Sequence, residues 1–168
     1  MLISFDGFRA DYIDWYNTPN FDQLKLDGVK SEGLKPVFPT KTFPNHYSIA
    51  TGMYIENHGL IGNNFFDQKL GELYTLKDRD IVEDERFYGG EPIWATAEKQ
   101  GVKTASYFWV GSEANAGGAQ PSIWKKYESK YIQKANKIIV VTKQAKQYYE
   151  NTLHINNNKI HVVPNSVR

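Results

Sequence analysis

Two polar residues stand at positions where an α/β fold could bind a ligand. Asp6 follows a short apolar segment and precedes Gly7, which predicts a carboxylate at the carboxyl end of a strand, where open α/β sheets bind ligands. Thr42 comes just before Pro44, a residue well suited to begin a helix. Its hydroxyl is therefore predicted beside a helix N-terminus, which favours anions. Taken singly, an Asp before Gly is more often a turn residue and such a Thr more often a helix cap.

The elements that would position these residues alternate between strand and helix. Short apolar or alternating segments predict strands at residues 2–5, 29–33 and 102–109. Cap residues and terminal glycines predict helices over residues 18–28, 44–51 and 91–100. This alternation favours an α/β sandwich with a mostly parallel sheet.

Composition excludes several classes of function. The 168 residues include 20 Lys and Arg against 19 Asp and Glu, a net charge of +1, so no basic excess implies nucleic-acid binding or attraction to an anionic membrane. The absence of Cys excludes disulfides, thiolate metal sites and a Cys nucleophile. No apolar run approaches the ~20 residues of a membrane span. Residues 1–5 are predicted to enter a strand directly, so no secretory signal is expected in this sequence; the compartment and the oligomeric state stay open.

Several longer motifs carry a resemblance to a known family. In order along the chain they are residues 6–9, 38–47, 51–59, 62–64, 89–94 and 107–113. Together they resemble the nucleotide pyrophosphatase/phosphodiesterase family over residues 1–127. The resemblance implies an alkaline-phosphatase-like fold, a three-layer α/β sandwich with a mostly parallel sheet, here expected to be truncated. It also implies two zinc ions and a small-molecule nucleotide substrate, with relatives that act outside the cytoplasm.

The resemblance also implies roles for individual residues. Asp6 matches a zinc-binding carboxylate, and Thr42 matches a zinc-bound nucleophile that becomes covalently attached to the nucleotide. Asn63 matches a donor to a phosphate oxygen. Four positions match the lining of the nucleotide pocket: Lys41, Phe43, Trp109 and Tyr127. Of these, Phe43 and Tyr127 are able to stack on a base. His46 and His58 match positions that do not bind zinc, which favours structural roles for both.

The zinc site implied by the family is incomplete in this sequence. Two zinc ions need about six protein ligands, and the family supplies most of them through later Asp and His residues. The last Asp here is Asp84, and no Asp-x-x-x-His or Asp-His sequence occurs. We therefore expect activity to be impaired or absent in this chain.

Residues 128–168 are predicted to form a different structural unit from residues 1–127. They are predicted to form a Rossmann-like βαβ unit, with strands at residues 137–142 and 159–165 around a helix over residues 143–153. Residues 135–137 and 163–167 resemble the end of the N-terminal domain of family-4-type glycosyltransferases. The residues of that family that bind nucleotide sugars would follow this segment, so none can be assigned here.

The sequence thus predicts two partial domains, residues 1–127 and 128–168, that meet near residues 127–130 without a linker. Such a junction fits a gene rearrangement or an error in sequence assembly, and the residues do not choose between them. The favoured function is zinc-dependent hydrolysis of nucleotide phosphodiester or pyrophosphate bonds. Two alternatives stay open: a glycosyltransferase fragment, and a non-enzymatic fusion fragment that binds a nucleotide weakly.

Overall fold

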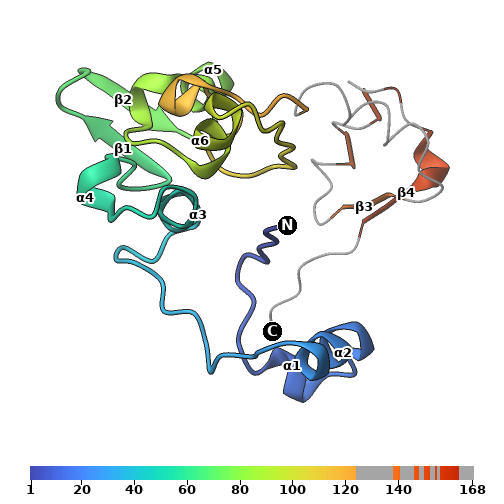
Figure 1. The fold of residues 1–168 in the computed structure, drawn as a ribbon. Coiled ribbons are helices and arrows are strands. Elements are labelled where there is room, and N and C mark those ends of the chain that lie inside the picture. Colours follow the sequence, from blue (N-terminus) through green and yellow to red (C-terminus); the bar gives the residue numbers. More distant parts are fainter. Residues whose placement is uncertain (124–137, 141–145, 148–149, 152–153, 155, 163–168) are drawn as a thin grey trace.

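The computed structural model describes residues 1–123, 138–140, 146–147, 150–151, 154 and 156–162. Figure 1 shows these parts as short helices and small sheets joined by long connections. The helices are α1 (Tyr12–Trp15), α2 (Pro19–Asp27), α3 (Thr42–Thr51), α4 (Ile55–His58), α5 (Arg79–Glu83) and α6 (Ile93–Lys99). Short 3-10 turns span Glu85–Phe87, Ala116–Gly118 and Asn157–Lys159. The strands are β1 (Asn64–Asp67), β2 (Glu72–Thr75), β3 (Ile138–Val140) and β4 (Ile160–Val162).

The three predicted helices are confirmed as α2, α3 and α6. In α2, Pro19 occupies the first helical position, where its missing N–H costs nothing. Helix α3 ends at Thr51, and the following Gly52 caps it in the left-handed conformation with φ of 69°. Helix α6 is shorter than predicted because Pro92 is its N-cap residue. Each helix was predictable because its start and stop signals are local.

The three predicted strands of the first 127 residues are wrong for this structure. Residues 2–5, 29–33 and 102–109 form no strand, and the predicted buried strand is exposed, with Leu2 57% and Ile3 60% accessible. A strand exists only where a second strand accepts its hydrogen bonds, and no described segment pairs with these three. The mostly parallel sheet of a three-layer sandwich is therefore not formed by the described residues.

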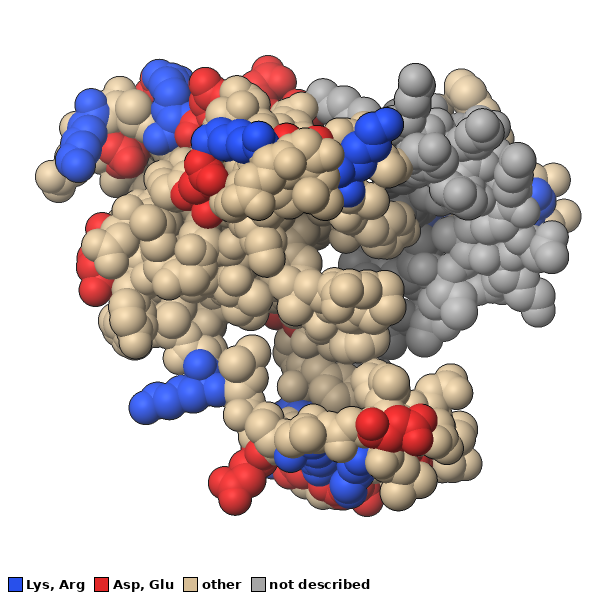
Figure 2. Space-filling model, in the orientation of Figure 1, with Lys and Arg blue, Asp and Glu red and all other residues tan. Residues whose placement is uncertain are grey.

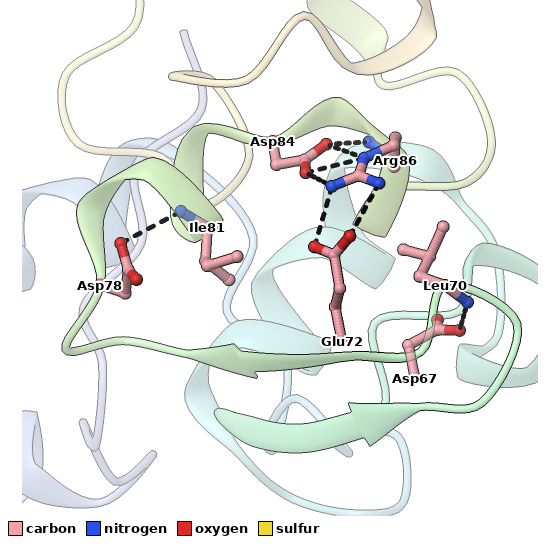
Figure 3. A network of polar contacts seen from close by, with 7 residues as sticks. All are labelled: Asp67, Leu70, Glu72, Asp78, Ile81, Asp84 and Arg86. Carbon is pink, nitrogen blue, oxygen red and sulfur yellow. Dashed lines mark hydrogen bonds and ion pairs between the residues drawn. The ribbon is translucent and has the colours of Figure 1, made fainter.

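The sheet found among the first 123 residues is an antiparallel hairpin of β1 and β2, which was not predicted. Asp67 organises its turn, since the side chain accepts hydrogen bonds from the backbone N–H groups of Lys69 and Leu70 at 2.8 and 3.0 Å. Figure 3 shows the bond from Leu70. Gly71 completes the turn with φ of 69°. Aromatic residues on both sides of an Asp…Gly turn were a local signal for this hairpin.

Arg86 ties the hairpin to the turn that follows α5. Its guanidinium donates to both carboxylate oxygens of Glu72 on β2, at 3.0 and 2.9 Å, and also to Asp84 (Figure 3). The planar fork of Arg matches a carboxylate in this two-bond geometry. These bonds tie β2 to the 3-10 turn Glu85–Phe87.

The hydrophobic core lies between α3, the hairpin, α6 and the segment after α6. Aromatic residues dominate it, and Tyr47 and Tyr74 are fully buried. The Tyr47 hydroxyl has no hydrogen-bond partner among the described residues, whereas the Tyr74 hydroxyl has one. Tyr74 bonds the hydroxyl of Tyr88 at 2.7 Å, and Tyr88 donates to the backbone oxygen of Val82 at 2.8 Å. Burial raises the pKa of Tyr74 to about 12, so this chain of hydrogen bonds stays protonated at physiological pH.

His58 is part of this core, in agreement with the structural role predicted for it. Its side chain is 1% exposed. The backbone N–H of Leu60 donates to Nδ1 at 3.2 Å, so Nε2 carries the proton and donates to the Ser48 hydroxyl at 2.8 Å. The ring is therefore neutral, and burial lowers its pKa below the usual 6.5.

This histidine predicts a pH dependence of stability. Below pH ~6.5 the unfolded chain protonates His58 while the folded chain does not, so the unfolded state binds more protons and the free energy of unfolding falls. We expect a decline from pH 6.5 to pH 5 with a slope of at most about 1.4 kcal/mol per pH unit for one proton. Urea unfolding at a series of pH values measures it. A free energy that stays constant or rises over this interval contradicts the assignment.

In the C-terminal part, β3 and β4 pair in parallel, with Ile138 opposite Ile160 and Val140 opposite Val162. The two predicted strands of this region therefore exist and pair in the predicted direction. Most of the predicted connecting helix lies outside the described residues, so the Rossmann-like unit as a whole is not shown.

The surface carries charges of both signs. On the face shown in Figure 2, Lys and Arg lie among Asp and Glu over most of the charged regions. Within the described part of the chain, no helix combines the length and apolar character needed to cross a bilayer.

Candidate active site

The start of α3 is fixed by an asparagine of its own first turn. The Asn45 side-chain oxygen accepts from the backbone N–H of Val37 at 2.7 Å, while its Nδ2 donates to the backbone oxygen of Lys41 at 2.9 Å. One side chain thus holds the connection before the helix to the helix itself. As a result, Thr42 becomes the first residue of α3. This role for Asn45 was missed, although an amide side chain one residue after Pro44 was visible in the sequence.

The structure brings Asp6 and Thr42 together from positions 36 residues apart. The Thr42 hydroxyl donates to Asp6 Oδ2 at 3.1 Å. Both residues line a cleft of about 1020 Å³ between residues 4–10, residues 30–37 and α3. A carboxylate and a hydroxyl therefore meet at a helix N-terminus that faces an open cleft, an arrangement able to receive an anionic group.

Asn63 approaches the same helix end. Its side-chain oxygen accepts from the backbone N–H of Phe43 at 3.1 Å. Because an N–H group can only donate, this contact fixes which end of the amide faces the helix. The Nδ2 group makes no hydrogen bond to any residue in the described ranges, so both its protons are free to donate to a ligand.

The residues predicted to line a nucleotide pocket do not all face the cleft. Lys41 lines it. The Phe43 ring instead packs edge-on against Tyr74 of the core, with ring centroids 6.4 Å apart. Trp109 is half-buried and donates from its indole N–H to the backbone oxygen of His46 at 3.0 Å. Tyr127 lies outside the described residues, so its predicted stacking on a base has no counterpart here.

The described residues offer few ligands for zinc. They contain no group of three or more His, Cys, Asp or Glu side chains placed to hold a metal ion. Asp6 and Thr42 offer two neighbouring oxygen atoms, whereas zinc takes about four ligands and prefers nitrogen or sulfur among them. These residues therefore do not fit the pair of zinc ions that the resemblance implies.

His46, predicted to be structural, contacts the site directly. Its ring bonds both Ser4 and the backbone oxygen of Thr42. Neither Ser4 nor this bridge was predicted. The available signal was the spacing of His46, four residues after Thr42 and hence on the same face of the helix.

Comparison with known proteins places the chain in a family. Residues 1–158 match the family described as type I phosphodiesterase / nucleotide pyrophosphatase. The match continues past the predicted junction near residues 127–130, and the predicted glycosyltransferase resemblance of residues 128–168 finds no support.

Curated relatives match about three quarters of the chain. A venom phosphodiesterase of Naja atra is 46% identical over 129 residues, which is 76% of this chain and 15% of that protein. Human ectonucleotide pyrophosphatase/phosphodiesterase family member 1 is 45% identical over 129 residues, 76% of this chain and 14% of that protein. The chain thus spans about 15% of the length of these relatives.

Solved structures show a related α/β fold. Murine ectonucleotide pyrophosphatase/phosphodiesterase 5, an inactive variant in complex with AMP, superposes with a TM-score of 0.69 at 28% identity. The superposition covers 96% of this chain and 41% of that one. Because the family match covers residues 1–158, the chain belongs to the type I phosphodiesterase / nucleotide pyrophosphatase family.

Proposed function

We propose that this chain carries the nucleophile half of a nucleotide phosphodiesterase/pyrophosphatase site, with Thr42 as the attacking residue. The observation that carries the proposal is the 3.1 Å hydrogen bond from the Thr42 hydroxyl to Asp6, made at the N-terminus of a ten-residue helix. A nucleophile held by a proton acceptor is the arrangement that covalent catalysis needs. Relatives include venom phosphodiesterases and a structure with bound AMP.

The proposed reaction has two steps. In the first, Thr42 Oγ1 forms a bond to phosphorus, the bond from phosphorus to the leaving oxygen breaks, and the hydroxyl proton passes to Asp6 Oδ2. In the second, water attacks the same phosphorus and the bond to Thr42 breaks, Asp6 returns its proton to the threonine oxygen, and the proton lost by the water passes to the solvent. The product is a nucleoside monophosphate.

Asn63 is proposed to stabilise the charge that develops on the phosphoryl group. Its oxygen accepts from the Phe43 N–H at the start of the helix, which leaves Nδ2 as the group proposed to donate to a phosphate oxygen. Donors of this kind typically contribute about 10²- to 10³-fold in kcat. Lys41, which lines the cleft, adds a positive charge on the same side.

Zinc enters the proposal only through its expected ligands. Asp6 and Thr42 are the residues that would contact it, and they are too few to hold it tightly. We therefore assign no step to zinc and expect a low rate from this chain. The base-binding roles of Phe43, Trp109 and Tyr127 likewise stay proposals, and Phe43 would have to turn away from Tyr74 to stack on a base.

The covalent intermediate provides the test. The chain is mixed with a nitrophenyl ester of a nucleoside monophosphate, with and without added zinc, and the release of nitrophenolate is followed. The reaction is stopped with acid, and the digested protein is analysed by mass spectrometry. We expect slow release and a nucleotidyl group on the peptide that contains Thr42. A nucleotidyl group on another residue contradicts the assigned nucleophile, and no release under either condition favours a non-enzymatic fragment.

A further inference from the structure

Two hydrogen bonds join the N-terminal segment to helix α3. The first is the bond between Thr42 and Asp6 described above. The second joins the Ser4 hydroxyl to His46 Nε2 at 2.8 Å. In this way a segment without regular secondary structure is attached to the helix at two neighbouring points.

The spacing of the two bonds matches on both sides. Ser4 and Asp6 are two residues apart, a separation of at most ~7 Å along a chain. Thr42 and His46 are four residues apart on one helix, a rise of about 6 Å along its axis. Because the two lengths agree, both bonds form at once. Two attachment points fix the direction of the segment as well as its distance, which one bond alone cannot do.

The His46 ring is held from the helix side. Its Nδ1 lies 2.8 Å from the backbone oxygen of Thr42, and because that oxygen only accepts, Nδ1 carries a proton. In the neutral ring Nε2 then accepts from the Ser4 hydroxyl. Trp109 adds a lateral contact, since its ring meets the imidazole edge-on with centroids 5.7 Å apart. The ring therefore has little freedom to rotate.

We infer that His46 is a positioning residue, which uses its bond to Ser4 to place the Asp6 carboxylate against the Thr42 hydroxyl. The residues near Asp6 have few other ties to the helix: Phe5 and Phe8 pack against Phe21 of α2 instead. Without His46, the hydrogen bond between Thr42 and Asp6 has to order this segment alone. The consequence for catalysis rests on the proposed function, whereas the consequence for structure does not.

Four variants distinguish the bond of the His46 ring to Ser4 from its bond to the Thr42 backbone oxygen. His46→Gln places an amide near the position of Nε2, and His46→Asn places one near Nδ1. The first is therefore expected to keep the bond to Ser4 and the second to keep only the bond within the helix. Ser4→Ala removes the same contact from the exposed N-terminal segment, where loss of folding is not expected. His46→Phe removes both bonds and keeps an aromatic ring against Trp109.

The structural measurement is the nuclear Overhauser contact between the Asp6 β-protons and the Thr42 methyl group, recorded for each protein. We expect the contact in the unmodified chain and in His46→Gln, and at least a fivefold loss of intensity in His46→Asn, His46→Phe and Ser4→Ala. Amide exchange at Ser48 and Ala50 checks that α3 itself is intact. An unchanged contact in Ser4→Ala and His46→Asn overturns the inference, as does its absence from the unmodified chain.

Hydrolysis of the nitrophenyl nucleotide ester separates this inference from the proposed function. We expect a ~10- to 100-fold fall in kcat for His46→Asn and Ser4→Ala, with KM within about twofold and partial recovery in His46→Gln, because small misplacement of reacting groups has effects of this size. If the substitutions only destabilised the fold, the amount of folded protein would fall, and His46→Gln would not recover kcat. If the unmodified chain is inactive, the proposed function fails, and the Overhauser contact still decides the role of His46.

Discussion

Replacement of Thr42 by Ala is expected to lower nitrophenolate release to the level of a sample without protein. The hydroxyl is the atom proposed to bond phosphorus, and no other hydroxyl contacts Asp6 among the described residues. Thr42→Ser keeps the oxygen at the start of α3 and is expected to retain measurable activity and the covalent intermediate. Initial rates with a nitrophenyl nucleotide ester measure both effects.

The same helix supplies a matched control. Thr51 is its last residue, and its hydroxyl donates to the backbone oxygen of Tyr47 at 2.9 Å. Thr51→Ala removes a hydroxyl of the same type from the opposite end of α3 and should leave the rate within about twofold. Equal activity in Thr42→Ala and the unmodified chain would remove Thr42 as nucleophile and leave the function open.

Replacement of Gly111 by Ala is expected to lower the free energy of unfolding by about 2–5 kcal/mol. An added Cβ would lie 2.8 Å from Tyr47 Cε2 and 3.1 Å from Tyr88 Cδ1, and both tyrosines are buried and unable to yield. Overpacking of this kind costs about 1–3 kcal/mol. Gly111 also has φ of 81°, a left-handed conformation that adds about 1–2 kcal/mol for Ala.

A substitution at Gly59 separates the cost of overpacking from the cost of backbone strain. It has φ of 79°, and an added Cβ would meet nothing within 4 Å. Gly59→Ala should therefore cost only the backbone strain of about 1–2 kcal/mol. Urea unfolding of both variants gives the difference, which we assign to contact with the buried tyrosines. Equal losses in the two variants would show that the side chains around Gly111 rearrange freely.

Helices α2, α3 and α6 could be predicted to within about two residues because their signals are local, whereas α1, α4 and α5 were not predicted. Pro19 at the start of α2 and Gly52 at the end of α3 are examples, and their conformational preferences hold in almost any surroundings. The strands could not be predicted in the same way. Residues 2–5 have a strand-like composition, yet they lie exposed and pair with no strand among the described residues, since pairing depends on a second segment that can come from anywhere in the chain.

The same distinction between local sequence signals and tertiary packing applies to the candidate site. Sequence motifs by themselves identified the family and marked Asp6, Thr42 and Asn63 as a set. Only the tertiary structure decided that Asp6 reaches Thr42 within hydrogen-bond distance, and that the Asn63 amide turns its oxygen to the helix. It also decided that Phe43 faces the core and that His46 meets Ser4. Residue types and spacing specify chemical capacity and local conformation, whereas the direction of a side chain depends on packing between segments far apart in the chain.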